Sequence, residues 1–122
     1  MFRAVTGGSN AALTVFLIVA AWRLVHGKRH PAVVVSSDGA NTTAVRLGHG
    51  VVTVVPVTSS VERVYPFQVL VPAGDCGLVV DSKAQAEQVR SVTVDRVAER
   101  LGTVPVELIR EVDEALRLHL GL

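Results

Sequence analysis

The sequence contains little cysteine and almost no net charge, and each shortage excludes a class of protein. It has 122 residues and a single cysteine, Cys76. One cysteine excludes an intramolecular disulfide and a zinc site built from cysteines. A reducing compartment is therefore the simplest expectation, and we expect a cytoplasmic protein. We interpret Cys76 itself as a small loop residue without a role.

The balance of charge excludes proteins that coat long nucleic acids through a broad basic face. Lysine and arginine together number 12, against 11 aspartate and glutamate residues. Such a chain lacks the wide positive field that non-specific coating requires. The balance is still compatible with a short site that holds only a few phosphates.

One apolar run, at residues 11–22 (AALTVFLIVAAW), is unusually long for this chain. It is too short for a membrane-spanning helix, which needs about twenty apolar residues, so we expect no membrane partner. Three interpretations stay open, and we rank a core segment first, with a strand or helix turn at residues 15–19. The others are a signal or membrane-associating segment, and an N-terminus that arose from a wrong start site or a fusion.

The sequence is rich in β-branched runs that end in small hydroxyl residues. Residues 31–38 (PAVVVSSD) and 51–60 (VVTVVPVTSS) each predict a buried strand followed by a polar loop. Pro56 has no amide proton, so it predicts either an edge strand or a bulge just before Thr58. A bulge there would turn the Thr58 hydroxyl out of the strand ladder.

Turn residues divide the rest of the chain into short elements. Residues 36–41 (SSDGAN) predict a turn, and residues 42–47 a short strand or an irregular segment. Further extended segments are expected at residues 64–71, 78–81 and 88–92, and a turn with a short final strand at residues 96–102.

The last segment has the spacing of an amphipathic helix. Its apolar residues recur three and four apart, Pro105 is tolerated in a first turn, and Gly121 ends the helix. The apolar positions are Ile109, Val112, Leu116 and Leu120. We therefore predict one domain, mainly β with α, in which a C-terminal amphipathic helix covers a small twisted sheet or partly open barrel.

Several stretches, in order along the chain, together resemble one known family. They are HPAVVVSSD at residues 30–38 with Asn41 after it, VVTVVPVTSS at 51–60, VYPFQVLV at 64–71, DSKAQAEQVR at 81–90 and VDEALRLHLGL at 112–122. This pattern resembles the MazF/PemK toxins of bacterial type II toxin–antitoxin systems. The resemblance runs from Pro31 to the last residue.

The resemblance implies a small SH3-like, partly open barrel (MazF/CcdB-like) with a C-terminal helix, and a homodimer. It implies an endoribonuclease that cleaves single-stranded RNA at short sequences, and a cognate MazE-like antitoxin that blocks the site. The expected chemistry is attack of the ribose 2′-hydroxyl on the adjacent phosphate, without a metal or other cofactor. This reaction needs help in removing the 2′ proton, a cation or donor at the phosphoryl oxygens, and an acid for the leaving oxygen.

The resemblance also implies catalytic positions. The family's threonine falls on Thr58. The residues alone already predict that the Thr58 hydroxyl is turned out of the strand ladder. The family's catalytic arginine precedes the proline that opens the first central strand, and this chain has His30 there. Either Arg29 takes over that role, or His30 acts as the acid or base, which an imidazole does well near neutral pH.

Substrate contacts implied by the resemblance are Glu87, Gln88 and Arg90, which match a segment near the RNA. Ser60 and Lys28 are further candidates for binding phosphate, one through its hydroxyl and the other through its charge. Tyr65 and Phe67 are candidates for base stacking, although core packing is the better interpretation for Phe67.

The N-terminal region departs from the family. The family opens with a strand of the type Arg-Gly-Glu-Ile-Trp and an acidic, Gly-Ser-Glu loop that covers the RNA site, and no such pattern precedes Lys28. We therefore divide the chain into an atypical apolar segment, residues 1–27, which replaces that strand and loop, and a toxin-like domain, residues 28–122. The leading hypothesis is an endoribonuclease toxin. The alternatives are a catalytically impaired binding module, acting as an antitoxin decoy or like the gyrase-poisoning toxins, and a membrane-associated variant.

Overall fold

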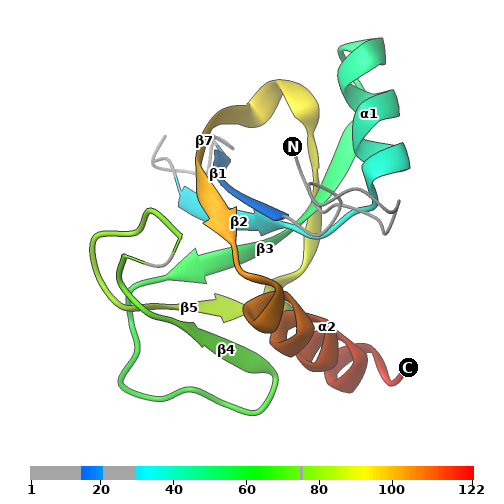
Figure 1. Ribbon diagram of the computed structural model, residues 1–122. Helices are drawn as coiled ribbons and strands as arrows, with labels where there is room; N and C mark the ends of the chain where they lie inside the picture. The colour runs from blue at the N-terminus through cyan, green and yellow to red at the C-terminus, as the bar shows by residue number, and fades with distance from the viewer. Residues whose placement is uncertain (1–14, 21–29, 75) are drawn as a thin grey trace.

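The computed structural model describes residues 15–20, 30–74 and 76–122. Within these residues the strands form one antiparallel sheet in the order β4-β5-β3-β2-β1-β7, and β6 pairs with β3 off this path (Figure 1). The strands are β1 (Val15–Ala20), β2 (His30–Val34), β3 (Val51–Thr58), β4 (Gln68–Val71), β5 (Ser82–Gln85), β6 (Arg90–Thr93) and β7 (Val97–Val104). The helices are α1 (Asp38–Leu47) and α2 (Val106–Leu120), with short 3₁₀ turns η2 (Ala86–Gln88) and η3 (Val94–Arg96).

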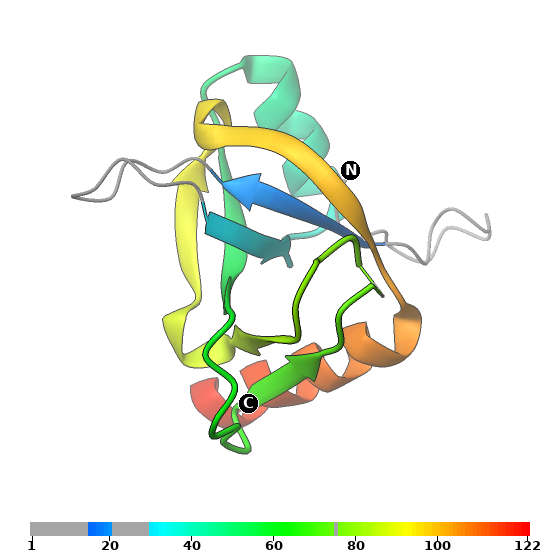
Figure 2. The ribbon, with the colours of Figure 1, turned by 90° about the vertical axis from the view of Figure 1, so that its left-hand side faces the viewer.

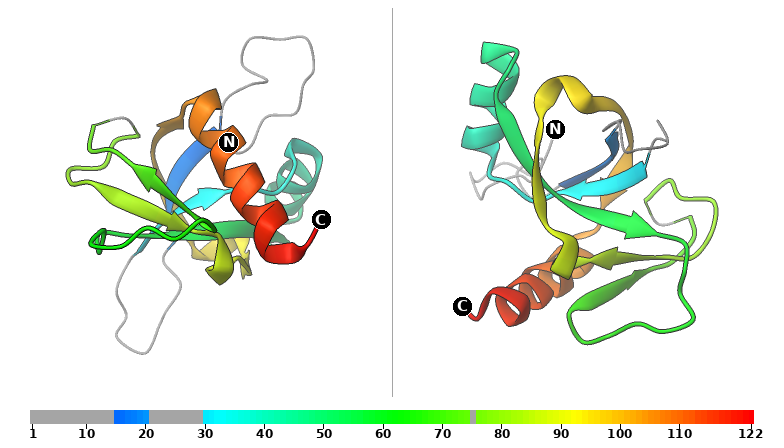
Figure 3. Two further views of the ribbon diagram at one scale, coloured as in Figure 1. Left: turned by 90° about the horizontal axis from the view of Figure 1, so that it is seen from below. Right: turned by 180° about the vertical axis from the view of Figure 1, so that it is seen from behind.

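The predicted fold class is confirmed. β4 and β7 end the path of strands without pairing with each other in the described residues, so the barrel is open. Helix α2 follows β7 and lies along β4 and η2 (Figures 2 and 3). It begins after Pro105 and ends at Gly121, whose φ of 73° lies in the left-handed region, as the sequence predicts.

Two layers of apolar side chains hold the molecule together. One lies between α2 and the sheet and includes Val55, Val57, Ile109 and Val112. The other lies between α1 and the opposite face of the sheet, where Ala44 packs against side chains such as Val52, Val54 and Val34. Successive residues of β3 alternate between these layers, because side chains of a strand point to opposite faces in turn. Strand β3 therefore contributes side chains to both cores.

The expectation that Pro56 marks an edge or a bulge of its own strand is wrong. Strand β3 is central, and its register with β2 runs without a shift through Ala32 and Pro56. On its other side β3 pairs with β6 up to Val54 and with β5 from Val57 onward. Pro56 lies where β3 stops pairing with β6 and starts pairing with β5. At this position its missing amide proton interrupts neither of the two pairings. The interruption lies in the partner, where η2 separates β5 from β6.

The segment expected to be a turn and a short strand is instead helix α1. Ser37, expected in the turn, is its N-cap, and its hydroxyl oxygen accepts a hydrogen bond from the amide of Ala40 at 3.2 Å. Asn41 is fully buried and donates through Nδ2 to the carbonyl of Ser36 at 2.9 Å, while its Oδ1 accepts from the Ser36 hydroxyl. These contacts outweigh the weak helix propensity of the sequence.

Other strand predictions need shifted bounds. The strand expected at residues 64–71 begins only at Gln68, after a turn in which the amide of Gln68 donates to the carbonyl of Tyr65 at 2.8 Å. Residues 78–81 are not a strand, because β5 begins at Ser82. The extended segment at 88–92 corresponds to β6, and the final strand extends through Gly102. A Cβ on Gly102 would lie 2.3 Å from the Cys76 carbonyl oxygen, so glycine permits this close backbone approach.

The apolar run at residues 11–22 contributes a strand to the sheet. Strand β1 pairs with β2 on one side and β7 on the other. The remainder of the run lies outside the described residues. Cys76 lies in the loop between β4 and β5, as expected, and its side chain is buried in the larger core cluster. None of the helices in the described part of the chain has the length and apolar character needed to cross a membrane.

Candidate active site

Thr58 is the last residue of the central strand β3, and its side chain is partly buried. Its Oγ1 accepts a hydrogen bond from the amide of Ser60 at 3.3 Å. Because the oxygen is used as an acceptor, the hydroxyl proton is left to be donated to another group. The strand end therefore presents a hydroxyl donor, although no bulge in β3 turns it outward.

The neighbouring strands bring two more residues near the end of β3. Lys83 of β5 pairs directly with Thr58. Residues that face each other in an antiparallel ladder project to the same face of the sheet. On the other side, the β2–β3 register ends at the pair Ala32 and Pro56, and His30, the first residue of β2, lies two residues beyond that pair. The topology thus sets Lys83 beside Thr58 and brings the start of β2 toward the same end of β3.

The predicted substrate contacts are more dispersed. Ser60 is exposed in the loop after β3, Gln88 is exposed in η2, and Arg90 is exposed at the start of β6, where it pairs with Val54. Arg29 and Lys28, the two basic candidates before His30, lie outside the described residues, and the His30 side chain is also not described.

Glu87 is held within the protein instead of facing freely outward. Its Oε2 accepts a hydrogen bond from Nε2 of the buried Gln68 at 2.7 Å, and Gln68 Oε1 accepts from the amide of Tyr65 at 3.1 Å. Its other oxygen, Oε1, is buried without a hydrogen-bond partner in the described structure. This chain of contacts ties η2 to the loop before β4.

The loop at residues 59–67 carries functional groups that sequence reasoning did not connect to Thr58. Tyr65 stacks on Phe67 with ring centroids 5.4 Å apart, and its ring is partly exposed. Arg63 donates to the Tyr65 hydroxyl at 3.2 Å, and Lys83 donates to the Arg63 carbonyl at 2.6 Å. No local sequence signal identifies Lys83, because its place beside Thr58 depends on strand pairing.

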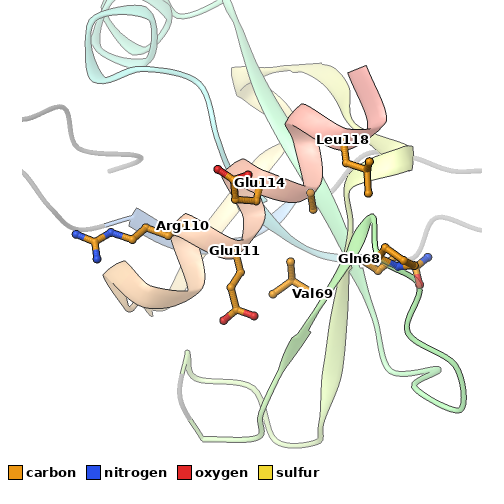
Figure 4. A pocket seen from close by; sticks show the side chains of 8 residues that line it. Gln68, Val69, Arg110, Glu111, Glu114 and Leu118 are labelled. Atoms are coloured by element: carbon orange, nitrogen blue, oxygen red, sulfur yellow. The ribbon is translucent and has the colours of Figure 1, made fainter. Parts of the chain in front are cut away.

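Two hollows differ in their chemistry. One, of about 170 Å³, is lined by the edge strand β6 and by Arg90 and Arg96. The other, of about 520 Å³, lies between β4 and α2, and its charged lining is one arginine, Arg110, and two carboxylates, Glu111 and Glu114 (Figure 4). Phosphates are attracted by arginine and repelled by carboxylates. The hollow at β6 therefore suits a nucleic acid better than the hollow at α2.

No set of three or more histidine, cysteine, aspartate or glutamate side chains in the described ranges is placed to hold a metal ion.

The fold by itself places the chain in a structural class. A toxin of Mycobacterium tuberculosis, MazF-mt6, has the same fold with a TM-score of 0.71, over 88% of this chain and 97% of the toxin, at 20% sequence identity. The open barrel with its C-terminal helix is thus the fold of MazF toxins.

The family is shown by sequence. The model of the PemK-like, MazF-like toxins of type II toxin–antitoxin systems matches residues 23–120, and the chain belongs to this family. Endoribonuclease MazF9 of Mycobacterium tuberculosis (strain ATCC 25618 / H37Rv) is 57% identical over 94 residues, which are 77% of this chain and 80% of that protein. A MazE-MazF crystal structure from Deinococcus radiodurans matches at 30% identity and a TM-score of 0.66, over 87% of this chain and 92% of the other.

Proposed function

We propose that this toxin is a sequence-specific endoribonuclease that cleaves single-stranded RNA. The observation that carries the proposal is the 57% identity to a protein named as an endoribonuclease, over most of both chains. The site supports it, because a hydroxyl donor stands at the end of β3, Lys83 pairs beside it, and β2 begins with His30 two residues beyond the pair Ala32 and Pro56. The proposed cleavage takes place in the cytoplasm.

The proposed reaction is attack of a ribose 2′-hydroxyl on the adjacent phosphate. The 2′ oxygen forms a bond to phosphorus as the bond to the 5′ oxygen breaks, which leaves a 2′,3′-cyclic phosphate and a 5′-hydroxyl. Thr58 donates its proton to a phosphoryl oxygen, which stabilises the charge that develops there. A threonine hydroxyl is a poor general base, so we propose that His30 or Arg29 assists the proton transfers. No metal is required in this scheme.

Substrate binding is proposed to extend along β3 toward β6. Arg90 and Arg96 line one hollow, and two arginines are suited to phosphate oxygens. Gln88 and Ser60 are exposed and able to contact bases or phosphates. Glu87 contributes indirectly, by holding Gln68.

The test is cleavage of a long single-stranded RNA by the purified protein in the presence of a chelator. Fragments with 5′-hydroxyl ends are expected. Thr58→Ala is expected to lower the rate by about 10² or more, the range seen when an oxyanion donor is removed. His30→Ala is expected to lower it as well. Thr42→Ala, an exposed threonine on α1, is the matched control and should cleave normally.

Intact RNA after incubation with the wild-type protein would exclude the enzyme and favour the impaired binding module. Cleavage that persists in both Thr58→Ala and His30→Ala would show that the active site lies elsewhere.

We further propose a homodimer that binds a MazE-like antitoxin. The 30% identical MazF from Deinococcus radiodurans has been crystallised with MazE. Exposed apolar side chains near the C-terminus, Leu118, Leu120 and Leu122, are suited to an interface. Co-expression with the product of a neighbouring small gene, followed by affinity capture and mass measurement, tests both points. A monomer that captures no such product would contradict them.

We also propose the division into residues 1–27 and 28–122, in which the first segment replaces the family's opening strand and loop. The pairing of β1 with β2 and β7 supports a strand-replacing role. A protein that lacks residues 1–27 should then lose much of its stability, since β2 and β7 each lose a neighbour.

A further inference from the structure

Lys83 is a buried cation with an unusual set of partners. It is only 8% exposed. Its ammonium donates to the Arg63 carbonyl at 2.6 Å and lies 6.0 Å from the centroid of the Tyr65 ring. Within the described residues no carboxylate forms an ion pair with it. Burying an ammonium without a counter-charge costs stability, so this side chain is not explained by the fold alone.

The position of Lys83 suggests its use. It pairs with Thr58 across the β3–β5 ladder, and with Leu70 on its other side in β4. Cβ atoms of such facing pairs are about 5 Å apart, on one face of the sheet. The Lys83 side chain therefore starts from the backbone position next to Thr58, whose hydroxyl is proposed to donate to the scissile phosphate, and extends to the Arg63 carbonyl.

Lys83 also closes the loop that leaves Thr58. Residues 59–62 run from the end of β3 to Arg63, whose carbonyl is bound by the ammonium of Lys83. Within this closed loop the amide of Ser60 donates to Thr58 Oγ1, which orients the hydroxyl. One side chain thus anchors the loop and provides charge beside the same site.

We propose that Lys83 is a positioning residue of the RNA site, which orients Thr58 through the loop at residues 59–63 and supplies a positive field at the phosphate. This inference rests on the proposed endoribonuclease function and names a residue of the same site. Because His30 stands where the resemblance implies an arginine, a fixed cation beside Thr58 assists in binding an anionic substrate.

The test compares Lys83→Met, which keeps an unbranched side chain but removes the charge, with Lys83→Arg, which keeps both charge and donor. Arg46→Met is the matched control, because Arg46 is exposed on α1, which packs near the start of β3 and far from Thr58 (Figure 1). Cleavage of a long single-stranded RNA and thermal unfolding are measured for all four proteins. Binding is measured against salt with a short random-sequence 2′-O-methyl RNA, which lacks the nucleophile.

Lys83→Met is expected to lower kcat/KM about tenfold, less than the loss for a donor that touches the reacting oxygen. Its plot of log binding constant against log salt should be less steep by about 0.7, the value for one phosphate of a single strand. Lys83→Arg should recover the slope and most of the rate. Lys83→Met should melt no lower than the wild-type protein, because it removes a buried unpaired charge.

A Lys83→Met protein with the wild-type rate and salt slope would overturn the inference. So would a lower melting temperature and rate with an unchanged slope, since that result describes a merely structural contact. If Arg46→Met changes the slope equally, the effect is one of net charge and the inference is also wrong. If the wild-type protein cleaves no RNA but the slope depends on Lys83 as described, the proposed enzyme fails while the role of Lys83 in binding stands.

Discussion

At the scale of single residues, the proposed site depends on what surrounds Thr58 at the end of β3. The place of Thr58 at a strand end was predictable from sequence, because a β-branched run followed by hydroxyl residues indicates a strand end, and its catalytic role is a proposal from the family resemblance. The place of Lys83 was not predictable, because only strand pairing brings it next to Thr58. The structure thus adds a cation beside Thr58 in a chain from which the arginine implied by the resemblance is absent.

Replacing His30 by arginine tests whether that absence limits the enzyme. Arginine keeps its charge at all relevant pH values and can bind two phosphoryl oxygens at once. His30→Arg is therefore expected to raise kcat/KM about tenfold or more, measured on an RNA with a mapped cleavage site. His49→Arg, in the exposed turn after α1, is the control for added charge and should change little. An unchanged rate in His30→Arg would favour catalysis by the histidine itself or by Arg29.

Asn41 tests the buried polar contacts that hold the start of α1. It is fully buried, and its side chain exchanges hydrogen bonds with Ser36, whose hydroxyl also accepts from the amide of Thr53 at 3.0 Å. Asn41→Ala removes the acceptor of the Ser36 hydroxyl proton and the donor to the Ser36 carbonyl, so the free energy of unfolding should fall by about 1–3 kcal/mol.

Urea unfolding measures this change, and the neighbouring Thr42→Ala is the control. Thr42 is exposed, and its replacement should shift the free energy of unfolding by less than about 0.5 kcal/mol. Equal effects of the two substitutions would show that Asn41 has no special role.

At the scale of elements, helix α1 shows what the local sequence pattern does not predict. Ser37, Asp38 and Gly39 have the composition of a turn, and the same residues serve as an N-cap and first helical turn. What decides between the two is tertiary, since Asn41 and Ala44 are buried against β2 and β3 only when the segment is helical. By contrast, α2 was predictable because its apolar spacing and its Pro and Gly boundaries agree.

Two glycines of this region should respond to alanine in opposite directions. A Cβ on Gly39 would meet no atom within 4 Å, so Gly39→Ala should raise the free energy of unfolding by about 0.4–1 kcal/mol through helix propensity. A Cβ on Gly50 would lie 2.6 Å from Ala44 Cα, where α1 packs on β3. Gly50→Ala should therefore destabilise the protein by about 1–3 kcal/mol.

Chemical denaturation of both variants measures the sign of each change in the free energy of unfolding. A destabilised Gly39→Ala would argue that residue 39 is not helical in solution. A neutral Gly50→Ala would show that α1 does not pack closely against the start of β3.

At the scale of the whole molecule, the distribution of charge decides how the proposed RNA substrate would be held. The chain carries 12 basic against 11 acidic residues, so its overall field attracts nucleic acid only weakly. Positive charge is instead local, at Lys83 beside Thr58 and at Arg90 and Arg96 by the edge strand β6. The near-neutral balance was visible in the sequence, whereas this grouping required the sheet order, because β5 and β6 pair with different halves of β3.

This grouping predicts a shallow salt dependence of RNA binding. Three local cations that each meet one phosphate of a single strand give a slope of about −2 in log binding constant against log salt. Titration of the 2′-O-methyl RNA at several salt concentrations measures it. Arg96→Gln should make the slope shallower by about 0.7, whereas Arg117→Gln, whose charge lies on α2 3.7 Å from Glu114, should not. A wild-type slope steeper than about −4 would mean that many more phosphates are bound. The RNA would then follow a surface much wider than the end of β3 and the edge of β6.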